Sequence, residues 1–344
     1  MKEYYSQRAA APGTLLISEG TFLSPKAGGW PMIPGIWDEE QIKKWKEVTE
    51  AVHAKGSYIY LQLWTLGRAA YISHLQSLNP EFHLVDASGI SLSDRPESDP
   101  KPIPLNVEEI REYVDLYANA ALNAVEKAGF DGIEIHACNG YLLDQFLQDV
   151  SNKRTDQYGG SVENRCRFAL EVVDAVIAAI GAERTGLRIS PWSEFQDMLM
   201  DDPIPTFTHL AKTLKANHPD MAYLHVIEPR ISGGDTLEEV KRPDASNDFL
   251  RDLWAPKAYI SAGGLTREGA IRLAKKAEEE RSGVELVSFG RHFIANPDLP
   301  VRLEKDIPLT PYNRETFFTS FAGDTAGVGY TDYPFAQAEI GHAM

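Results

Sequence analysis

The densest group of polar side chains lies in residues 135–142, which read Ile-His-Ala-Cys-Asn-Gly-Tyr-Leu. His136 and Asn139 can donate two hydrogen bonds to one oxygen atom, and convergent donors stabilise negative charge that develops on it. Tyr141 is then a candidate proton donor. The alternative interpretation is a core histidine and an asparagine that caps a helix. Three such groups in a short stretch favour catalysis, whereas Cys138 is interpreted as a small apolar filler.

Other candidate site residues stand inside or at the end of short apolar runs. Gln62 and Trp64 are two residues apart, so a strand would point both to the same side. The Gln62 amide, with donors and an acceptor, suits the edge of a heteroaromatic ring, while packing is the more usual role of a tryptophan. Arg188 needs a partner in a buried strand, either a carboxylate or an electron-rich cofactor ring. His225 is expected to be a core residue.

Two glycine-bearing segments near the end of the chain could bind a phosphate. Gly263 and Gly264 precede a predicted helix, and Gly290 precedes Arg291, whose guanidinium matches phosphate geometry. Together they predict a cofactor that carries a phosphate. The chain has neither a Rossmann fingerprint nor a P-loop, so a dinucleotide or nucleoside triphosphate held in the usual way is not expected. We expect no metal site, because no histidine and carboxylate spacing suggests one.

The elements that must position these residues alternate along the chain. Helical patterns separate seven short apolar runs, so the sequence predicts an α/β fold, a (β/α)8 TIM-type barrel. A closed barrel needs eight strands and residues 1–11 read as a helix, so the first strand is expected to be missing. Residues 1–344 are expected to form a single domain. The strand candidates are residues 14–18, 58–64, 132–136, 186–190, 222–227, 258–262 and 285–289, and the helix candidates are residues 1–11, 38–55, 106–128, 162–180, 206–217, 266–281 and 314–322.

Charge and composition restrict the partners and the compartment. Lys plus Arg number 34 against 50 Asp plus Glu, a net charge of −16, which disfavours nucleic acid and anionic membranes as partners. Two cysteines, the lack of an apolar leader and the lack of a long apolar run predict a soluble cytoplasmic protein. Residues 73–104 and 228–247, without clear periodicity, are expected to be long loops on the catalytic face.

Taken together, these motifs resemble the Old Yellow Enzyme family of FMN-dependent ene-reductases, in its fungal and yeast-like branch. The resemblance runs nearly end to end and is most specific in Arg-Thr-Asp-Gln-Tyr-Gly-Gly-Ser at 154–161 and in the segment from His136 to Phe146. It implies an NAD(P)H-dependent oxidoreductase that reduces the C=C bond of an α,β-unsaturated ketone or aldehyde. A homodimer is compatible with it, and a place in secondary metabolism is suggested by the branch.

The resemblance also implies roles for individual residues. His136 and Asn139 would bind the substrate carbonyl, Tyr141 would protonate the α-carbon, and Trp64 and Tyr330 would line the substrate pocket. The positions implied to bind FMN are Gly20, Gln62, Arg188, Gly263, Gly264, Gly290 and Arg291.

Two departures from the family pattern leave alternatives open. The strand that usually precedes the first helix is absent, and Ser288 stands where a phosphate-loop glycine is common. The same three polar groups would also serve a redox-neutral isomerisation of a fungal metabolite. The third alternative is an inactive barrel that binds no FMN.

Overall fold

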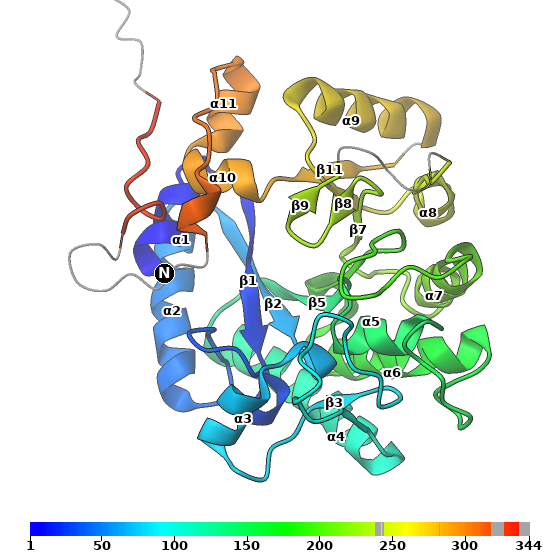
Figure 1. Ribbon diagram of the computed structural model, residues 1–344. Coiled ribbons are helices and arrows are strands. Elements are labelled where there is room, and N and C mark those ends of the chain that lie inside the picture. The colour runs from blue at the N-terminus through cyan, green and yellow to red at the C-terminus, as the bar shows by residue number, and fades with distance from the viewer. Residues whose placement is uncertain (238–241, 243, 282, 318–326, 337–344) are drawn as a thin grey trace, which may run out of the picture. The chain divides into compact units, whose positions relative to one another are not determined.

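Seven strands, one at each predicted position, form a single sheet in the computed structural model, which describes residues 1–237, 242, 244–281, 283–317 and 327–336. The order of the strands is β1-β2-β5-β6-β7-β10-β11, and every pair with a recorded register, from β2 with β5 to β10 with β11, is parallel. Figure 1 shows the strands. Their bounds are Leu15–Phe22, Tyr58–Trp64, Gly132–Ala137, Thr185–Ile189, Tyr223–Ile227, Tyr259–Ala262 and Glu285–Ser288.

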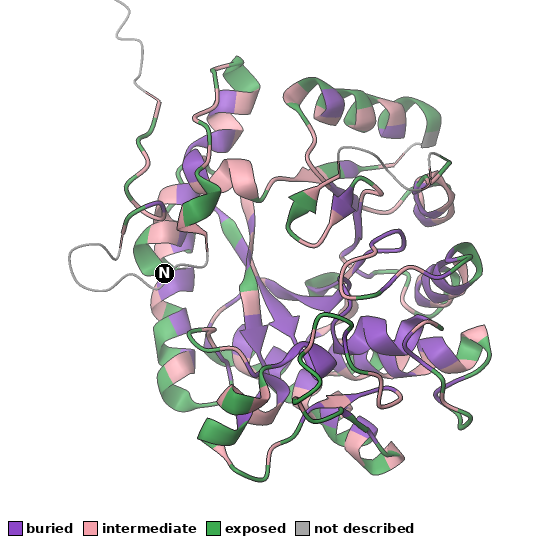
Figure 2. Ribbon diagram, in the orientation of Figure 1, coloured by how far each residue is buried: buried purple, intermediate pink, exposed green. Residues whose placement is uncertain are grey.

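The central strands are buried on both faces. All residues of β5, β7 and β10 are buried, and Figure 2 shows buried residues concentrated in the strands and on one face of the helices. A parallel sheet requires this, because the crossover helices cover its faces. The sequence therefore shows continuous apolar runs here rather than an alternating pattern.

The helices between the strands begin and end close to the predicted positions. They are α1 (Lys2–Arg8), α2 (Glu39–His53), α4 (Val107–Leu122), α6 (Val162–Ile180), α7 (Ile204–Asn217) and α9 (Arg267–Arg281). Asn106 and Glu109 form a capping box at the start of α4, and a π-helical turn over Asn123–Lys127 continues it. Along the sheet, α4 packs against α6, α6 against α7, and α7 against α8 (Asp248–Trp254).

Some boundaries and several short elements differ from the expectation. Strand β1 continues to Phe22, so Gly20 lies inside it and not after it. The segments expected to be loops contain α3 (Ile72–Leu78) and two small sheets, a parallel β3 (Val85–Asp86) with β4 (Ile103–Pro104) and an antiparallel β8 (Ile231–Ser232) with β9 (Asp235–Thr236). The helices α5 (Leu142–Leu147), α8, α10 (Arg291–Ala295) and α11 (Leu299–Lys305) were not predicted. Each spans seven residues or fewer, too short to show helical periodicity.

The last predicted helix, residues 314–322, is described only in part. A 3-10 turn covers Arg314–Thr316, and residues 318–322 lie outside the described part of the chain.

The described chain falls into two compact units, which are treated separately below. The larger unit contains residues 17–43 and 60–288, and therefore nearly the whole sheet. The smaller unit contains residues 1–16, 44–59 and 289–344. In the smaller unit the buried Arg8 donates to the carbonyl oxygens of Phe293, Ile294 and Tyr330, which ties α1 to the C-terminal segment. The prediction of a single domain stays a prediction.

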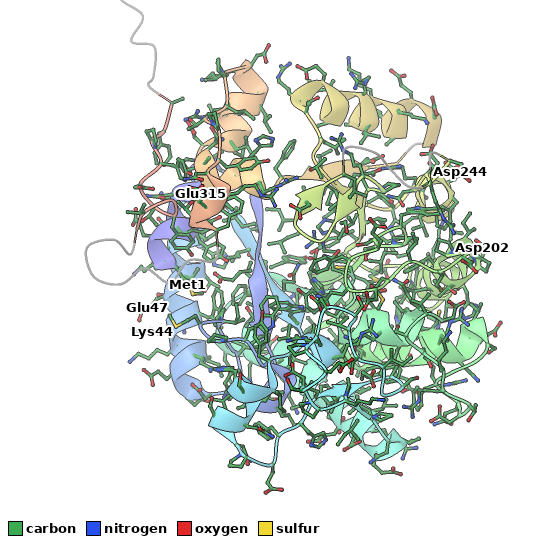
Figure 3. All side chains as sticks on the ribbon, in the orientation of Figure 1. Met1, Lys44, Glu47, Asp202, Asp244 and Glu315 are labelled. Carbon is green, nitrogen blue, oxygen red and sulfur yellow. The ribbon has the colours of Figure 1, made fainter. Side chains whose placement is uncertain are left out.

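Several acidic side chains lie at the surface. Asp202, Asp244 and Glu315, labelled in Figure 3, are all exposed. Among the described helices, none combines the length and the apolar character that a membrane span requires.

Candidate active site

A tight turn after β5 positions the polar group predicted from residues 135–142. Asn139 and Gly140 both have left-handed backbone conformations, with φ of 55° and 73°. The Asn139 N–H donates to the Ser190 hydroxyl at 2.8 Å, and the Gly140 N–H donates to the Asp144 carboxylate at 2.8 Å. Asn139 does not cap the following helix, because the N-cap residue of α5 is Tyr141. The turn therefore holds Asn139 for a reason other than capping.

The rings of His136, Tyr141 and Trp64 pack against one another in this part of the larger unit. The Tyr141 ring lies 5.2 Å from the His136 ring and 4.8 Å from the Trp64 ring, both in edge-to-face geometry. The His136 and Trp64 centroids are 5.9 Å apart. All three side chains are more than nine-tenths buried. The structure thus brings together an imidazole, a phenol and an indole from the ends of β2 and β5.

Burial sets the protonation states of these groups. Burial and then the charge of Arg188 lower the pKa of His136 to about 3, so its imidazole is neutral near pH 7 and carries one N–H. Burial raises the pKa of Tyr141, so its hydroxyl keeps its proton. Burial likewise raises the pKa of Cys138, whose sulfur lies 3.3 Å from the His136 Nε2, and the thiol stays neutral as expected for a filler.

One layer deeper, a buried carboxylate joins three strands. Glu134, on β5 and completely buried, accepts from the Gln62 Nε2 at 2.7 Å and from the His225 Nδ1 at 2.8 Å. Burial alone would raise the pKa of Glu134, but His225, Arg188 and the Gln62 hydrogen bond outweigh it, and the pKa is lowered to about 2. Burial lowers the pKa of His225, so a neutral imidazole donates to an ionised carboxylate.

Arg188 lies in register between two of these residues. It pairs with His136 on one neighbouring strand and with His225 on the other. Its Nε is buried and has no hydrogen-bond partner among the described residues. The two partners expected for Arg188 were a carboxylate and a cofactor ring, and both have support. The charge of Glu134 interacts with Arg188, and the Nε donor remains for a bound group.

The glycines predicted to face the cofactor lie in positions where a side chain would collide or strain the backbone. A Cβ on Gly20 would lie 2.6 Å from the Trp64 ring. Gly263 and Gly264, after β10, have φ of 149° and 59°, which side chains disfavour. The missing Cβ makes room for the chain's own side chains, Trp64 at Gly20 and Glu228 at Gly263.

The remaining predicted residues belong to the smaller unit. A Cβ on Gly290 would meet no atom within 4 Å, and the Arg291 guanidinium lies 5.5 Å from the Tyr312 ring. Tyr330 stacks on Tyr4 with ring centroids 4.2 Å apart. The predicted roles of Gly290 and Arg291 in phosphate binding, and of Tyr330 in the substrate pocket, stay predictions.

The residues of the larger unit fit a flavin. The Gln62 Nε2 donates to Glu134, so the amide oxygen of Gln62 can accept from an imide N–H of a ring. The unpartnered Arg188 Nε can donate to a carbonyl on the same ring edge. The Asn139 Oδ1 is also buried and unpartnered in the described part of the chain. A planar group that has carbonyl acceptors and an N–H would bind both the Gln62 amide oxygen and the Arg188 Nε.

Sequence reasoning missed Glu134, Ser190 and Asp144. The signal for Glu134 was present, because a carboxylate in the middle of an apolar strand needs a partner for the same reason as Arg188. Ser190 and Asp144 accept backbone N–H groups at a turn, and Asp144 also accepts from Gln148; spacing along the chain does not reveal these bonds.

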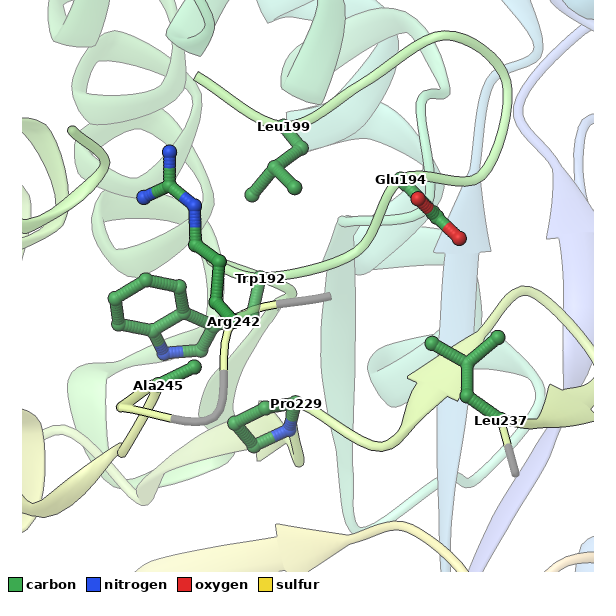
Figure 4. Close-up of a pocket in the computed structure, with 7 residues that line it drawn as sticks. All are labelled: Trp192, Glu194, Leu199, Pro229, Leu237, Arg242 and Ala245. Atoms are coloured by element: carbon green, nitrogen blue, oxygen red, sulfur yellow. The ribbon is translucent and has the colours of Figure 1, made fainter. Parts of the chain in front are cut away.

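A separate small hollow lies between the loops that follow β6 and β7 (Figure 4). None of the predicted site residues lines it. It is formed by Trp192, Glu194, Leu199, Pro229, Leu237, Arg242 and Ala245.

These features define a class, an α/β protein that holds a redox ring at its strand ends. They are a parallel sheet, paired hydrogen-bond donors, a protonated phenol and an arginine with an unpartnered donor. Comparisons with known proteins identify the family. Residues 1–310 match the model of the NADH:flavin oxidoreductase / NADH oxidase family. The chain belongs to this family.

Three relatives agree with this assignment. The chain is 49% identical to the chanoclavine-I aldehyde reductase of Penicillium roqueforti, over 98% of the chain and 87% of the relative. It is 45% identical to a probable inactive reductase of Epichloe festucae var. lolii, over 99% and 87%. The crystal structure of Old Yellow Enzyme from a Pichia species superposes with a TM-score of 0.86 at 36% identity, covering 98% of this chain and 85% of that one. The predicted TIM-type fold and Old Yellow Enzyme likeness are confirmed, and the protein is an NAD(P)H-dependent flavin oxidoreductase.

Proposed function

We propose that this protein is an ene-reductase that uses FMN and NAD(P)H to reduce the C=C bond of an α,β-unsaturated aldehyde or ketone. The observation that carries the proposal is the group of His136, Asn139 and Tyr141 at the end of β5, beside Arg188 on β6. An oxidoreductase of this family needs donors for a substrate oxygen and a proton source, and this strand end contains both.

His136 and Asn139 bind and polarise the substrate. The neutral imidazole of His136 offers one N–H, and the Nδ2 of the Asn139 amide can supply a second donor. Aimed at one carbonyl oxygen, they stabilise the charge that builds on it as the conjugated bond accepts a hydride. Because His136 is held neutral, it donates a hydrogen bond without giving up a proton.

Tyr141 supplies the proton. Its hydroxyl is protonated across the physiological range, and its ring is fixed between those of His136 and Trp64. The balance is one hydride to the β-carbon and one proton to the α-carbon, with one NAD(P)H oxidised for each alkene reduced. The phenolate that remains regains its proton from water.

Five residues would hold the cofactor: Gln62, Arg188, Gly20, Gly263 and Gly264. Gln62 and Arg188 would bind the polar edge of its ring, Gly20 leaves room for Trp64, and the two glycines after β10 would offer backbone N–H groups to its phosphate. FMN, when bound, supplies the hydride that it has received from NAD(P)H.

An aldehyde is the favoured substrate class, because a relative that shares 49% of its residues is named as an aldehyde reductase. A second candidate, an inactive protein, is motivated by the relative named as a probable inactive reductase, and a redox-neutral isomerisation is the alternative that the three polar groups would also serve. The predicted cytoplasmic location and the homodimer stay predictions, and light scattering on the purified protein would test the latter.

The deciding experiment is an anaerobic titration of the purified chain with FMN, NADPH and an enal such as cinnamaldehyde. We expect a bound-flavin spectrum that bleaches with NADPH and returns with the enal, with one saturated aldehyde formed per NADPH. An isomerised product without NADPH consumption would establish the redox-neutral function instead. A folded chain that takes up no flavin would refute both flavin-dependent functions and would favour the inactive candidate.

A further inference from the structure

The fully buried Glu134 makes no contact that the proposed chemistry requires, yet it carries a charge. It lies two residues before His136 on β5 and opposite Gln62 of β2 in the sheet register. Both of its oxygens are used, Oε1 by Gln62 and Oε2 by His225. An ionised carboxylate at such a depth is strongly disfavoured unless other groups compensate it.

The hydrogen bond from Gln62 determines which atom of that amide is left for a ligand. Glu134 can only accept, so it binds the Nε2 of Gln62 and selects one of the two amide orientations. The amide oxygen is then free, and no hydrogen bond to it is recorded in the described part of the chain. A neutral residue at position 134 would impose no such choice.

Arg188 is a cation whose charge favours the ionised form of Glu134, after the larger effect of His225. His225 is neutral, so it contributes a hydrogen bond but no full charge. Arg188 is the charged side chain that acts on both Glu134 and His136, and it lies in register between β5 and β7. The negative charge of Glu134 therefore reduces the positive potential that Arg188 presents at the strand ends.

We propose that Glu134, oriented by His225, is a positioning residue for the flavin: it fixes the Gln62 amide as an acceptor and offsets the charge of Arg188, and so lowers the reduction potential of the bound cofactor. This inference rests on the proposed function. A lower potential favours hydride donation to the substrate, because reduced flavin gains negative charge that an uncompensated Arg188 would stabilise.

The test is the Glu134→Gln variant of the FMN-loaded protein, with its potential measured by equilibration against a reference dye. Glutamine keeps the shape and can exchange hydrogen bonds with Gln62 and His225, but it removes the charge. We expect the equilibrium to shift about tenfold toward reduced flavin, about 30 mV for a two-electron couple. Glu134→Asp, which keeps the charge, should restore most of the original potential.

Glu285→Gln is the matched control. Glu285 is also a buried carboxylate with two donors, Arg251 at 2.9 Å and Ser261 at 2.5 Å, in a network that does not include Gln62 or Arg188. Its substitution removes the same charge and should leave the potential unchanged. Equal shifts in both variants, or no shift in Glu134→Gln, would overturn the proposal.

Two further outcomes are separable. If Glu134→Gln does not fold, His225→Phe decides. It keeps a ring but has no donor for Oε2, so it weakens the ionised form of Glu134 and should shift the equilibrium about threefold in the same direction. An unchanged potential there contradicts the inference. If the parent protein takes up FMN and reduces the enal while the variants behave like it, only this inference fails, whereas a parent that binds no FMN refutes the proposed function.

Discussion

Replacing Tyr141 with phenylalanine removes one atom from a site whose rings stay in place. The ring is held edge-to-face against Trp64 at 4.8 Å and His136 at 5.2 Å, and phenylalanine keeps both contacts. Tyr141 is more than nine-tenths buried, and its hydroxyl hydrogen-bonds with the side chain of Gln196, the one interaction that phenylalanine would lose. We therefore expect the free energy of unfolding to change by about 1 kcal/mol or less.

The effect on catalysis should be large and confined to one half-reaction. A positioned general acid contributes about 10²- to 10⁴-fold to a rate, which corresponds to about 3–5 kcal/mol of barrier. Reoxidation of the reduced enzyme by an enal needs the proton and should slow by this factor. Reduction of the flavin by NADPH transfers only a hydride and should stay within about threefold of the parent rate.

Stopped-flow absorbance measures the two half-reactions separately, and Tyr117→Phe is the control. Tyr117 is completely buried on α4, and its hydroxyl lies 2.8 Å from the Thr65 hydroxyl, so its loss should cost about 1 kcal/mol of stability and leave both rates unchanged. If Tyr141→Phe slows both half-reactions equally, or slows neither, the assignment of Tyr141 as the proton donor is wrong.

Three further variants test the surroundings of the site. Burial raises the pKa of Asp144 to about 7, so the native state binds a proton that the unfolded state has lost between about pH 4 and 7, and stability falls as the pH rises through this window. In denaturant titrations, Asp144→Asn should gain about 1.4 kcal/mol per pH unit relative to the parent between pH 5 and 7; a constant difference would contradict the raised pKa. Arg154→Lys cannot reproduce the four hydrogen bonds of the guanidinium, two of them to Asp156, and the free energy of unfolding should fall by about 2 kcal/mol, with an unchanged midpoint refuting this. Gly20→Ala should displace the Trp64 ring and weaken FMN binding. The recovery of flavin fluorescence on release measures the affinity, and a parent-like affinity would show that FMN binding does not depend on the position of the Trp64 ring.

The sheet could be predicted because burial on both faces leaves a local signature. The positions of all seven strands follow from short runs of branched apolar residues, and the α6 bounds are those expected. Strand β1 was underestimated because Ser18, Glu19 and Gly20 interrupt its apolar character. The short helices could not be predicted, since one or two turns contain no period to read and depend on tertiary contacts.

The site was predictable only where its residues are neighbours in sequence. His136, Asn139 and Tyr141 follow one another at the end of β5, so a single strand end reveals them. The bond between Glu134 and His225 joins residues 91 positions apart, and it depends on the register of β5, β6 and β7. No spacing along the chain encodes that register, although each residue alone is anomalous in an apolar strand.

The most recognisable motif of the chain has a structural role that its specificity does not reveal. In the run at residues 154–161, the Arg154 guanidinium binds the carbonyl oxygens of Ala87 and Leu105, and Asp156 holds it in a bidentate pair. A Cβ on Gly159 would lie 2.4 Å from the Arg154 carbonyl oxygen, so glycine is required there. The motif fastens the segment containing β3 and β4 to the loop after α5.

The turn after β5 shows how backbone and chemistry can demand the same residue. Position 139 is left-handed, a conformation that asparagine tolerates better than most residues, and the Ser190 hydroxyl holds its N–H. Glycine would suit the backbone equally well but would remove the amide that we propose as a donor to the substrate oxygen. Asparagine satisfies both conditions, because its short side chain adds a donor without adding a branched Cβ. The neighbouring Gly140, whose Cβ would lie 2.7 Å from Gln196, has only the backbone condition to meet, and there glycine is found.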